Sequence, residues 1–188
     1  MNRACAQLAK WHDDGHSDLK LSINLLAKQL LKGNPVETIK AAISEHGILS
    51  QFLEIEVKED LLVKDQASSI EVLNAIKEIG VSVCLDDFGR GFASLSFLQK
   101  FPLDTIKIDR TLVRDLTGNK RIQAIIQTTC RLAKELGLSV IIEGIESESQ
   151  LPLIKECNAD FAQGFYYSTP LPEEELDLEK FWGTPNAS

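Results

Sequence analysis

The stretch Val81-Ser-Val-Cys-Leu-Asp-Asp-Phe-Gly89 shows the structural unit from which the chain is built. Residues 81–85 are a short apolar run with branched side chains, which indicates a buried strand. Before it, apolar residues recur at helical spacing from Ile70, and Ser68-Ser-Ile-Glu71 has the spacing of a capping box at the start of that helix. Two aspartates follow the run directly. The predicted unit is therefore a helix, then a buried strand that ends in polar side chains.

The same alternation continues on both sides of this stretch. Further strands are predicted over residues 19–24, 52–57, 105–108 and 139–142 and from residue 161, and helices over about 4–11, 34–45, 120–136, 150–156 and 173–182. This order predicts parallel strands with right-handed crossovers, either in an open doubly wound sheet or in a (β/α)₈ barrel. Doubly wound sheets usually carry a glycine-rich phosphate turn after the first strand, and the sequence has none. We therefore expect an α/β, TIM-like (β/α) barrel that is incomplete, with about six of the eight strands.

Composition and charge limit the classes of function. The 188 residues are 44% hydrophobic and 26% charged, which fits one globular domain over residues 1–188. The net charge of −8 argues against a DNA or RNA polymer as partner, and a phosphate-bearing substrate would need local cations. No apolar run is long enough for a membrane segment, and no secretory signal is recognisable, so a cytoplasmic location is expected. The four cysteines lack metal-ligand spacing and are expected to be reduced and mostly buried.

Every predicted strand ends in polar residues, which are Asn24, Glu56, the pair Asp86 and Asp87, Lys107, Glu143 and Gln163. The carboxyl ends of barrel strands converge on one face, where active sites lie. The oxygen donors in this set suit Mg²⁺ or Mn²⁺, and two adjacent aspartates can bridge a metal pair of the kind used in phosphoester hydrolysis. Without metal, the convergent carboxylates would raise one another's pKa values. Lys107 would supply a fixed positive charge for a phosphate oxygen or an attacking hydroxide.

Simpler interpretations exist for each residue taken alone. Asp86 and Asp87 could form a turn, Lys107 could be a plain ion pair with Asp109, and Glu54 is expected to be a solvated surface residue. Glu143 and Gln163 each precede a glycine and could also belong to turns. Lys107 could alternatively form a Schiff base as in aldolases, but neighbouring carboxylates would keep it protonated. The joint pattern over six strand ends favours a metal site.

The same residues carry a resemblance to a known family. The segments that match are Ser22-Ile-Asn24, Leu53-Glu-Ile-Glu-Val-Lys-Glu59, Asp86-Asp-Phe-Gly-Arg-Gly-Phe-Ala-Ser-Leu95, Ile106-Lys-Ile-Asp-Arg110, Ile142-Glu-Gly-Ile-Glu146 and Gln163-Gly-Phe165. In combination they resemble the successive motifs of the EAL family, bacterial phosphodiesterases that linearise cyclic di-GMP. The resemblance runs from about Ala4 to Pro172. It implies cyclic di-GMP as the ligand and a two-metal site for Mg²⁺ or Mn²⁺.

The resemblance also implies roles for individual residues. The metal ligands would be Asn24, Glu56, Asp86, Asp87 and Glu143, with Asp86 bridging the two ions and Glu143 as a ligand or general base. Lys107 would orient or activate the attacking water. Gln163 would position water or substrate, Glu146 would contact substrate, and Glu59 would hold the loop that follows Asp87.

One departure from the family pattern concerns the start of the domain. No Glu-Ala-Leu occurs, although its Glu is a metal ligand in the family, and the sequence begins at the helix that normally follows this motif. We therefore expect an open barrel whose strand edges pair with other chains, a homo-oligomer, and weak or absent turnover. This leaves room for an upstream sensory domain in the native protein. The alternative function is a catalytically inactive cyclic-di-GMP receptor or protein-interaction module.

The other departure lies around the aspartate pair. Arg90 and Phe92 stand where the family usually has Thr and Tyr, and Ala93 replaces a Ser. Lys58 stands where a Thr usually precedes the glutamate at position 59. In the family this loop links the metal site to dimer contacts, so we expect its regulation to differ here.

Overall fold

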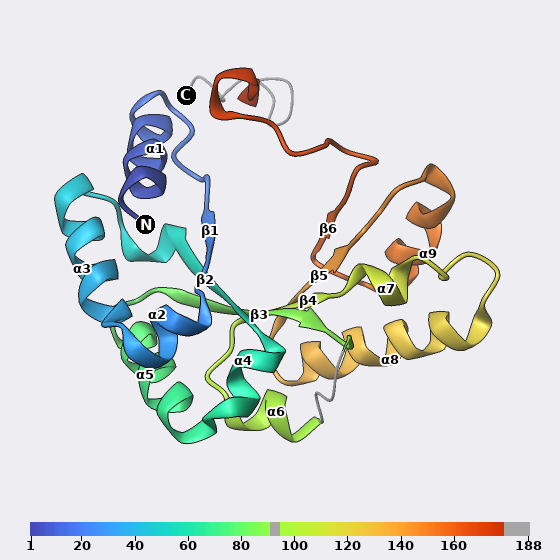
Figure 1. The fold of residues 1–188 in the computed structure, drawn as a ribbon. Coiled ribbons are helices and arrows are strands. Elements are labelled where there is room, and N and C mark those ends of the chain that lie inside the picture. Colours follow the sequence, from blue (N-terminus) through green and yellow to red (C-terminus); the bar gives the residue numbers. More distant parts are fainter. Residues whose placement is uncertain (91–94, 179–188) are drawn as a thin grey trace.

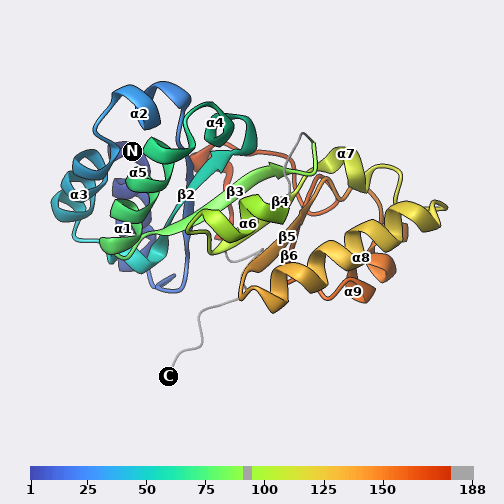
Figure 2. The same cartoon turned by 90° about the horizontal axis from the view of Figure 1, so that it is seen from below.

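A single parallel sheet forms the centre of the computed structural model, which describes residues 1–90 and 95–178 (Figure 1). Its six strands are β1 (Leu21–Asn24), β2 (Leu53–Lys58), β3 (Ser82–Phe88), β4 (Thr105–Ile108), β5 (Ser139–Glu143) and β6 (Phe161–Gln163). They lie side by side in the order of the sequence, so the sheet has no point at which the winding reverses. This order is that of a barrel and excludes the doubly wound alternative. The sheet curls into a half barrel with its helices on the outside (Figures 1 and 2).

The long helices agree with the sequence prediction. They are α1 (Asn2–Asp13), α3 (Pro35–His46), α5 (Gln66–Glu78) and α8 (Lys120–Glu135), with the shorter α9 (Leu151–Glu156). Asn34 caps α3 by accepting a hydrogen bond from the Glu37 amide at 3.3 Å. The capping box predicted at Ser68 is wrong, because Asp65 is the N-cap of α5 and accepts from the Ser68 amide at 3.2 Å. The N-cap is the residue at which the backbone enters the helix, and that residue is Asp65, three positions before Ser68.

Four short helices were not predicted: α2 (Ala27–Lys32), α4 (Glu59–Lys64), α6 (Leu95–Lys100) and α7 (Arg110–Val113). Each has six residues or fewer, so a periodic pattern over it is weak. Short 3₁₀ turns cover Ser50–Phe52, Glu148–Gln150 and Glu173–Glu175. Of the closing helix expected over residues 173–182, the described residues show the last of these 3₁₀ turns and helical backbone at Leu178, and residues 179–182 lie outside them.

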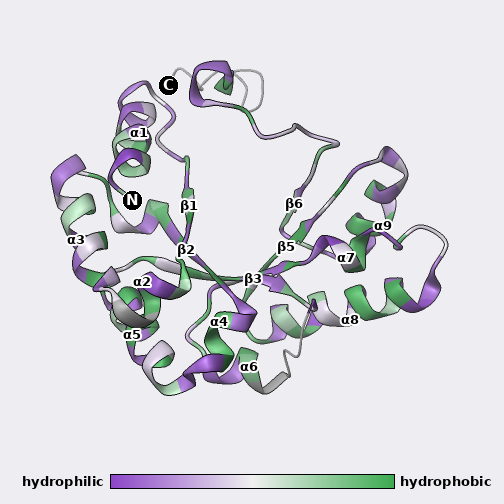
Figure 3. Ribbon diagram, viewed as in Figure 1, coloured by the Kyte–Doolittle hydropathy of each residue, from purple (hydrophilic) through white to green (hydrophobic). Residues whose placement is uncertain are grey.

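The hydrophobic core lies between the convex face of the sheet and the helices. Successive side chains of a strand point to opposite faces of the sheet, and hydrophilic and hydrophobic residues are interleaved along the strands in Figure 3. Ile55, Leu85, Ile106 and Ile142 point to the convex side, and each has an exposure of 0%. All four cysteines are buried as well. The side chains on the convex face pack against the helices. The polar side chains of the strands lie on the concave face, and these form the candidate site.

The half barrel has two open edges in the part of the chain described. β1 pairs only with β2, and β6 pairs only with β5. Near the second edge, the side chains of Phe161 and Phe165 are each 63% exposed. Within the described residues, no helix is both long and apolar enough to cross a membrane.

Candidate functional site

The end of β3 presents two carboxylates at one place. Asp86 lies in the strand with an exposure of 7%, and Asp87 adopts a left-handed backbone conformation with φ of 60°. The register with β4 shifts between Leu85 and Phe88, which is the signature of a bulge. The Asp87 amide donates a hydrogen bond to Asp86 Oδ1 at 2.9 Å. The pair is therefore a bulged strand end and not a simple turn, and the bulge directs both side chains toward the carboxyl end of the sheet.

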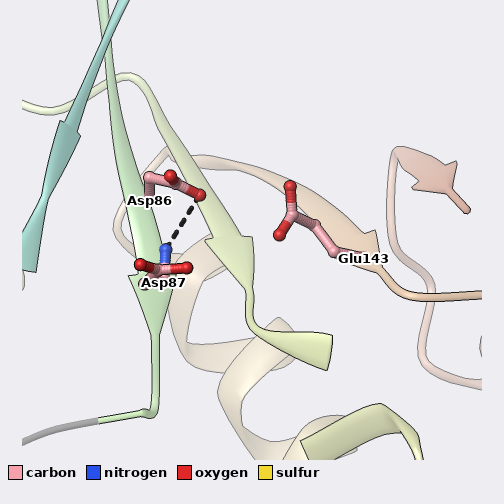
Figure 4. Close-up of side chains that lie close together, drawn as sticks. All are labelled: Asp86, Asp87 and Glu143. Carbon is pink, nitrogen blue, oxygen red and sulfur yellow. Dashed lines mark hydrogen bonds between the residues drawn. The ribbon is translucent and has the colours of Figure 1, made fainter. Parts of the chain in front are cut away.

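Glu143 at the end of β5 completes a cluster of three carboxylates. One oxygen from each of Asp86, Asp87 and Glu143 lies within 4.8 Å of the others, the one such group among the described residues. Figure 4 shows the Glu143 carboxylate turned toward Asp86 across the intervening β4. An all-oxygen donor set at this spacing matches the preference of Mg²⁺, Mn²⁺ or Ca²⁺.

Lys107 on β4 lies at the centre of the concave face. Its ammonium donates to Glu143 Oε1 at 2.7 Å and to Glu56 Oε1 at 3.1 Å, and it is only 5% exposed. Glu56 is 7% exposed, so this arrangement is a buried ion-pair network. Lys107 does not pair with Asp109. Asp109 instead caps α7 and accepts a hydrogen bond from the Thr111 amide at 2.8 Å.

Burial perturbs the titration of these groups. It raises the pKa of Asp86 and of Glu143, an effect that Lys107 opposes and the neighbouring carboxylates reinforce. Burial alone would lower the pKa of Lys107, but the hydrogen bond to Glu143 and the charge of Glu56 outweigh it and raise that pKa. Lys107 is thus held as an ammonium, which makes it a poor nucleophile and argues against Schiff-base chemistry.

The remaining predicted residues surround this centre without joining the cluster. Asn24 and Gln163 are exposed at the two edge strands, in register with Glu56 and Glu143 respectively. Glu146 is exposed and lines a small hollow together with Glu143 and Gln163. Glu59 is buried at the first turn of α4, with an exposure of 5%. Of the substituted loop residues, Phe92 and Ala93 lie outside the described part of the chain.

Two cations beside Asp87 were not predicted as part of the site. Lys58 Nζ lies 2.6 Å from Asp87 Oδ2 and 3.8 Å from Asp86 Oδ2, and Arg90 Nη1 lies 3.7 Å from the same Asp87 oxygen. The hydrogen bond to Asp87 raises the pKa of Lys58. Strand alternation could have found Lys58, because it lies two residues beyond Glu56 on the same face and in register with Asp86.

The expectation that Glu54 is a solvated surface residue is wrong. Its carboxylate is half-buried on the concave face and accepts hydrogen bonds from Ser22 Oγ at 2.7 Å and from Thr105 Oγ1 at 2.8 Å. These hydrogen bonds connect β1, β2 and β4 at Glu54, two residues before Glu56 along β2. Glu54 therefore stabilises the half barrel by linking its strands through side-chain hydrogen bonds.

Comparison with known proteins gives a consistent result. The EAL domain family matches residues 1–170. The chain is 35% identical over 189 residues to the cyclic di-GMP phosphodiesterase NbdA of Pseudomonas aeruginosa, covering 98% of this chain and 24% of that protein. It is 31% identical over 176 residues to the bifunctional diguanylate cyclase/cyclic di-GMP phosphodiesterase MucR of the same organism, covering 94% of this chain and 26% of MucR. The chain thus spans about a quarter of these relatives.

Solved structures resemble the chain over most of its length. The PaMucR phosphodiesterase in complex with c-di-GMP superposes with a TM-score of 0.88 at 31% identity, over 94% of this chain and 71% of that one. Klebsiella pneumoniae BlrP1 in its manganese and cy-diGMP complex at pH 6 gives a TM-score of 0.81 at 29% identity, over 89% of this chain and 42% of that one.

Replacing Lys107 with Met tests the ion-pair network. Two buried carboxylates would lose their common cation, so the free energy of unfolding at pH 7 should fall by about 3–5 kcal/mol in metal-free protein. Without the lysine, the folded variant would hold a proton on Glu143 more tightly than the unfolded chain does, because burial raises the pKa of that carboxyl and Lys107 no longer opposes it. Part of the loss should therefore be regained as the pH falls from about 7 to 5, as measured by urea unfolding.

The matched control is Lys10→Met, which removes an exposed lysine from α1 and should change stability by less than about 0.5 kcal/mol. A Lys107→Met protein as stable as the wild type at pH 7 would contradict the network.

Proposed function

The chain belongs to the EAL domain family, and we propose that it forms a metal-dependent phosphodiesterase domain that hydrolyses cyclic di-GMP to the linear dinucleotide. The observation that carries this proposal is the cluster of Asp86, Asp87 and Glu143 within 4.8 Å, with the buried Lys107 ammonium bonded to Glu143. Relatives named as cyclic di-GMP phosphodiesterases and structures described as complexes with that dinucleotide support the choice of substrate.

The donor set fits divalent cations such as Mg²⁺ or Mn²⁺. Asp86, Asp87 and Glu143 would hold the ions, and Glu56 and Asn24 would supply further oxygens from the adjacent strands. Once bound, such ions polarise a phosphodiester oxygen and lower the pKa of an attacking water. The manganese complex of the similar BlrP1 supports this chemistry.

The chain's own residues have separate tasks in this proposal. Lys107 stays protonated and presents a fixed positive charge that orients the attacking water or a phosphate oxygen. It also keeps Glu143 in place through their 2.7 Å contact. Glu143, whose pKa burial raises, is suited to accept a proton when it is not engaged as a ligand.

Two hollows beside the cluster provide room for a dinucleotide. One is lined by Lys58, Glu59, Lys64, Asp87 and Arg90 and has a volume of about 620 Å³, within the range of small-molecule sites. Its cations Lys58, Lys64 and Arg90 are balanced by the carboxylates of Glu59, Asp60 and Asp87, so bound divalent ions would supply the positive charge that an anionic substrate needs here. The other hollow holds Glu143, Glu146 and Gln163, which would contact substrate and water. Glu59 would support the loop that follows Asp87.

A turnover assay tests this function. Metal-depleted protein is incubated with cyclic di-GMP and Mg²⁺ or Mn²⁺, with or without chelator, and the linear dinucleotide is measured by chromatography. We expect slow, chelator-sensitive product formation, because this sequence has no Glu-Ala-Leu glutamate and a lost ligand lowers metal affinity by about 10–100-fold. Asp86→Asn should lower the rate by roughly 100-fold or more.

Asp115→Asn is the control, because Asp115 is an exposed carboxylate away from the strand ends. Full activity of Asp86→Asn would refute the ligand assignment. Binding of cyclic di-GMP without product under all metal conditions would replace the enzyme with the receptor alternative.

We also propose that the chain self-associates through its open edges. β1 and β6 each have one unpaired side in the described residues, and unpaired edges pair with other strands unless they are covered. Light scattering at low micromolar concentration should give a mass of at least two chains. A well-behaved monomer would contradict this proposal and leave the assignment of the site untouched.

A further inference from the structure

Asp87 already has two positively charged partners from the chain itself. Lys58 Nζ and Arg90 Nη1 approach the same oxygen, Asp87 Oδ2, at 2.6 Å and 3.7 Å. They come from different places: Lys58 is the last residue of β2, and Arg90 follows the end of β3. Lys58 also reaches Asp86 Oδ2, at 3.8 Å. Its ammonium therefore lies beside both aspartates of the pair.

The exposures of these side chains show that the two carboxylates are fixed, whereas the two cations can move. The Asp86 and Asp87 side chains are 11% and 19% exposed, whereas those of Lys58 and Arg90 are 47% and 64% exposed. The carboxylates are thus held by the sheet, while the two cations approach from the solvent side on long side chains. A half-exposed lysine can leave such a contact at little cost, since exposed ion pairs are weak.

We propose that Lys58, assisted by Arg90, is an internal counter-ion that occupies the cation position beside Asp87, so that a divalent ion enters there only by displacing the Lys58 ammonium. This inference rests on the proposed function, because it concerns the same metal site. It makes the two ends of the cluster unequal. In the part of the chain that the structure describes, Glu143 forms its ion pair with the buried Lys107, which stays in place, whereas the Asp87 end must first release Lys58.

The other cations of the site do not compete in this way. Lys107 is 5% exposed and is held by Glu56 and Glu143, so it cannot swing away from its partners. Lys64 lines the same hollow as Lys58 but makes no ion pair within the described residues. Removing Lys64 therefore changes the net charge by the same amount while leaving the Asp87 contact intact.

The effect on metal binding follows from the loss of one contact. A divalent ion that binds Asp87 must replace a partly exposed ion pair and then tolerate a cation close by. Exposed pairs contribute up to about 1 kcal/mol, which corresponds to roughly fivefold in affinity. Replacing Lys58 should therefore strengthen divalent binding at the Asp87 end by about fivefold.

Calorimetric titration of the full, metal-depleted chain with Mn²⁺ tests the inference, with free Mn²⁺ followed in parallel by electron paramagnetic resonance. Lys58→Thr should bind the weaker ion about fivefold more tightly than the wild type. Lys58→Arg keeps the charge and should behave like the wild type. Lys64→Thr, the charge-matched control, should change affinity by less than about twofold.

The outcomes separate this inference from the proposed function. Mn²⁺ affinities for Lys58→Thr equal to those of the wild type, or raised equally in Lys64→Thr, would overturn the counter-ion role while leaving the metal site standing. Failure of Mn²⁺ to bind any of the four proteins would overturn the metal site itself, and the inference with it.

Discussion

The Lys107 ammonium between Glu56 and Glu143 is the interaction on which the concave face depends. Glu56 is buried here and Glu143 is partly buried, and burying such charges unpaired costs several kcal/mol each. A cation from the strand that runs between β3 and β5 offsets that cost. The contacts of 3.1 Å and 2.7 Å also connect β2, β4 and β5 across β3. The network therefore holds the strand ends together and fixes the position of Glu143, which a metal ion would share.

Much of this arrangement could be predicted from the sequence, because strands and longer helices each have a characteristic spacing of apolar residues. β4 has the predicted bounds, residues 105–108, since a buried strand between turn residues leaves little freedom. The polar residues that end the strands converge because parallel strands in sequential order bring their carboxyl ends to one face. That rule places Asp86 and Glu143 at the same face, but it does not predict the direction of the Asp87 side chain. The family resemblance added the identity of the ligand, which periodicity could not supply.

What the sequence could not provide depends on register and local backbone geometry. The bulge at Asp87, with its φ of 60°, leaves no mark in a single sequence, yet it decides where the second carboxylate points. The partners of Glu54, Ser22 and Thr105, lie 32 and 51 residues away, and only the register brings them together. In helices of four to six residues, such as α7 and α4, a periodic pattern is likewise weak.

Binding of divalent cations by Asp86, Asp87 and Glu143 can be observed by anomalous diffraction from crystals of the chain soaked in Mn²⁺, recorded near the manganese absorption edge. We expect an anomalous peak within coordination distance of Asp86 and Glu143. Crystals that take up Mn²⁺ only elsewhere, or show no peak at these carboxylates at millimolar concentration, would contradict it.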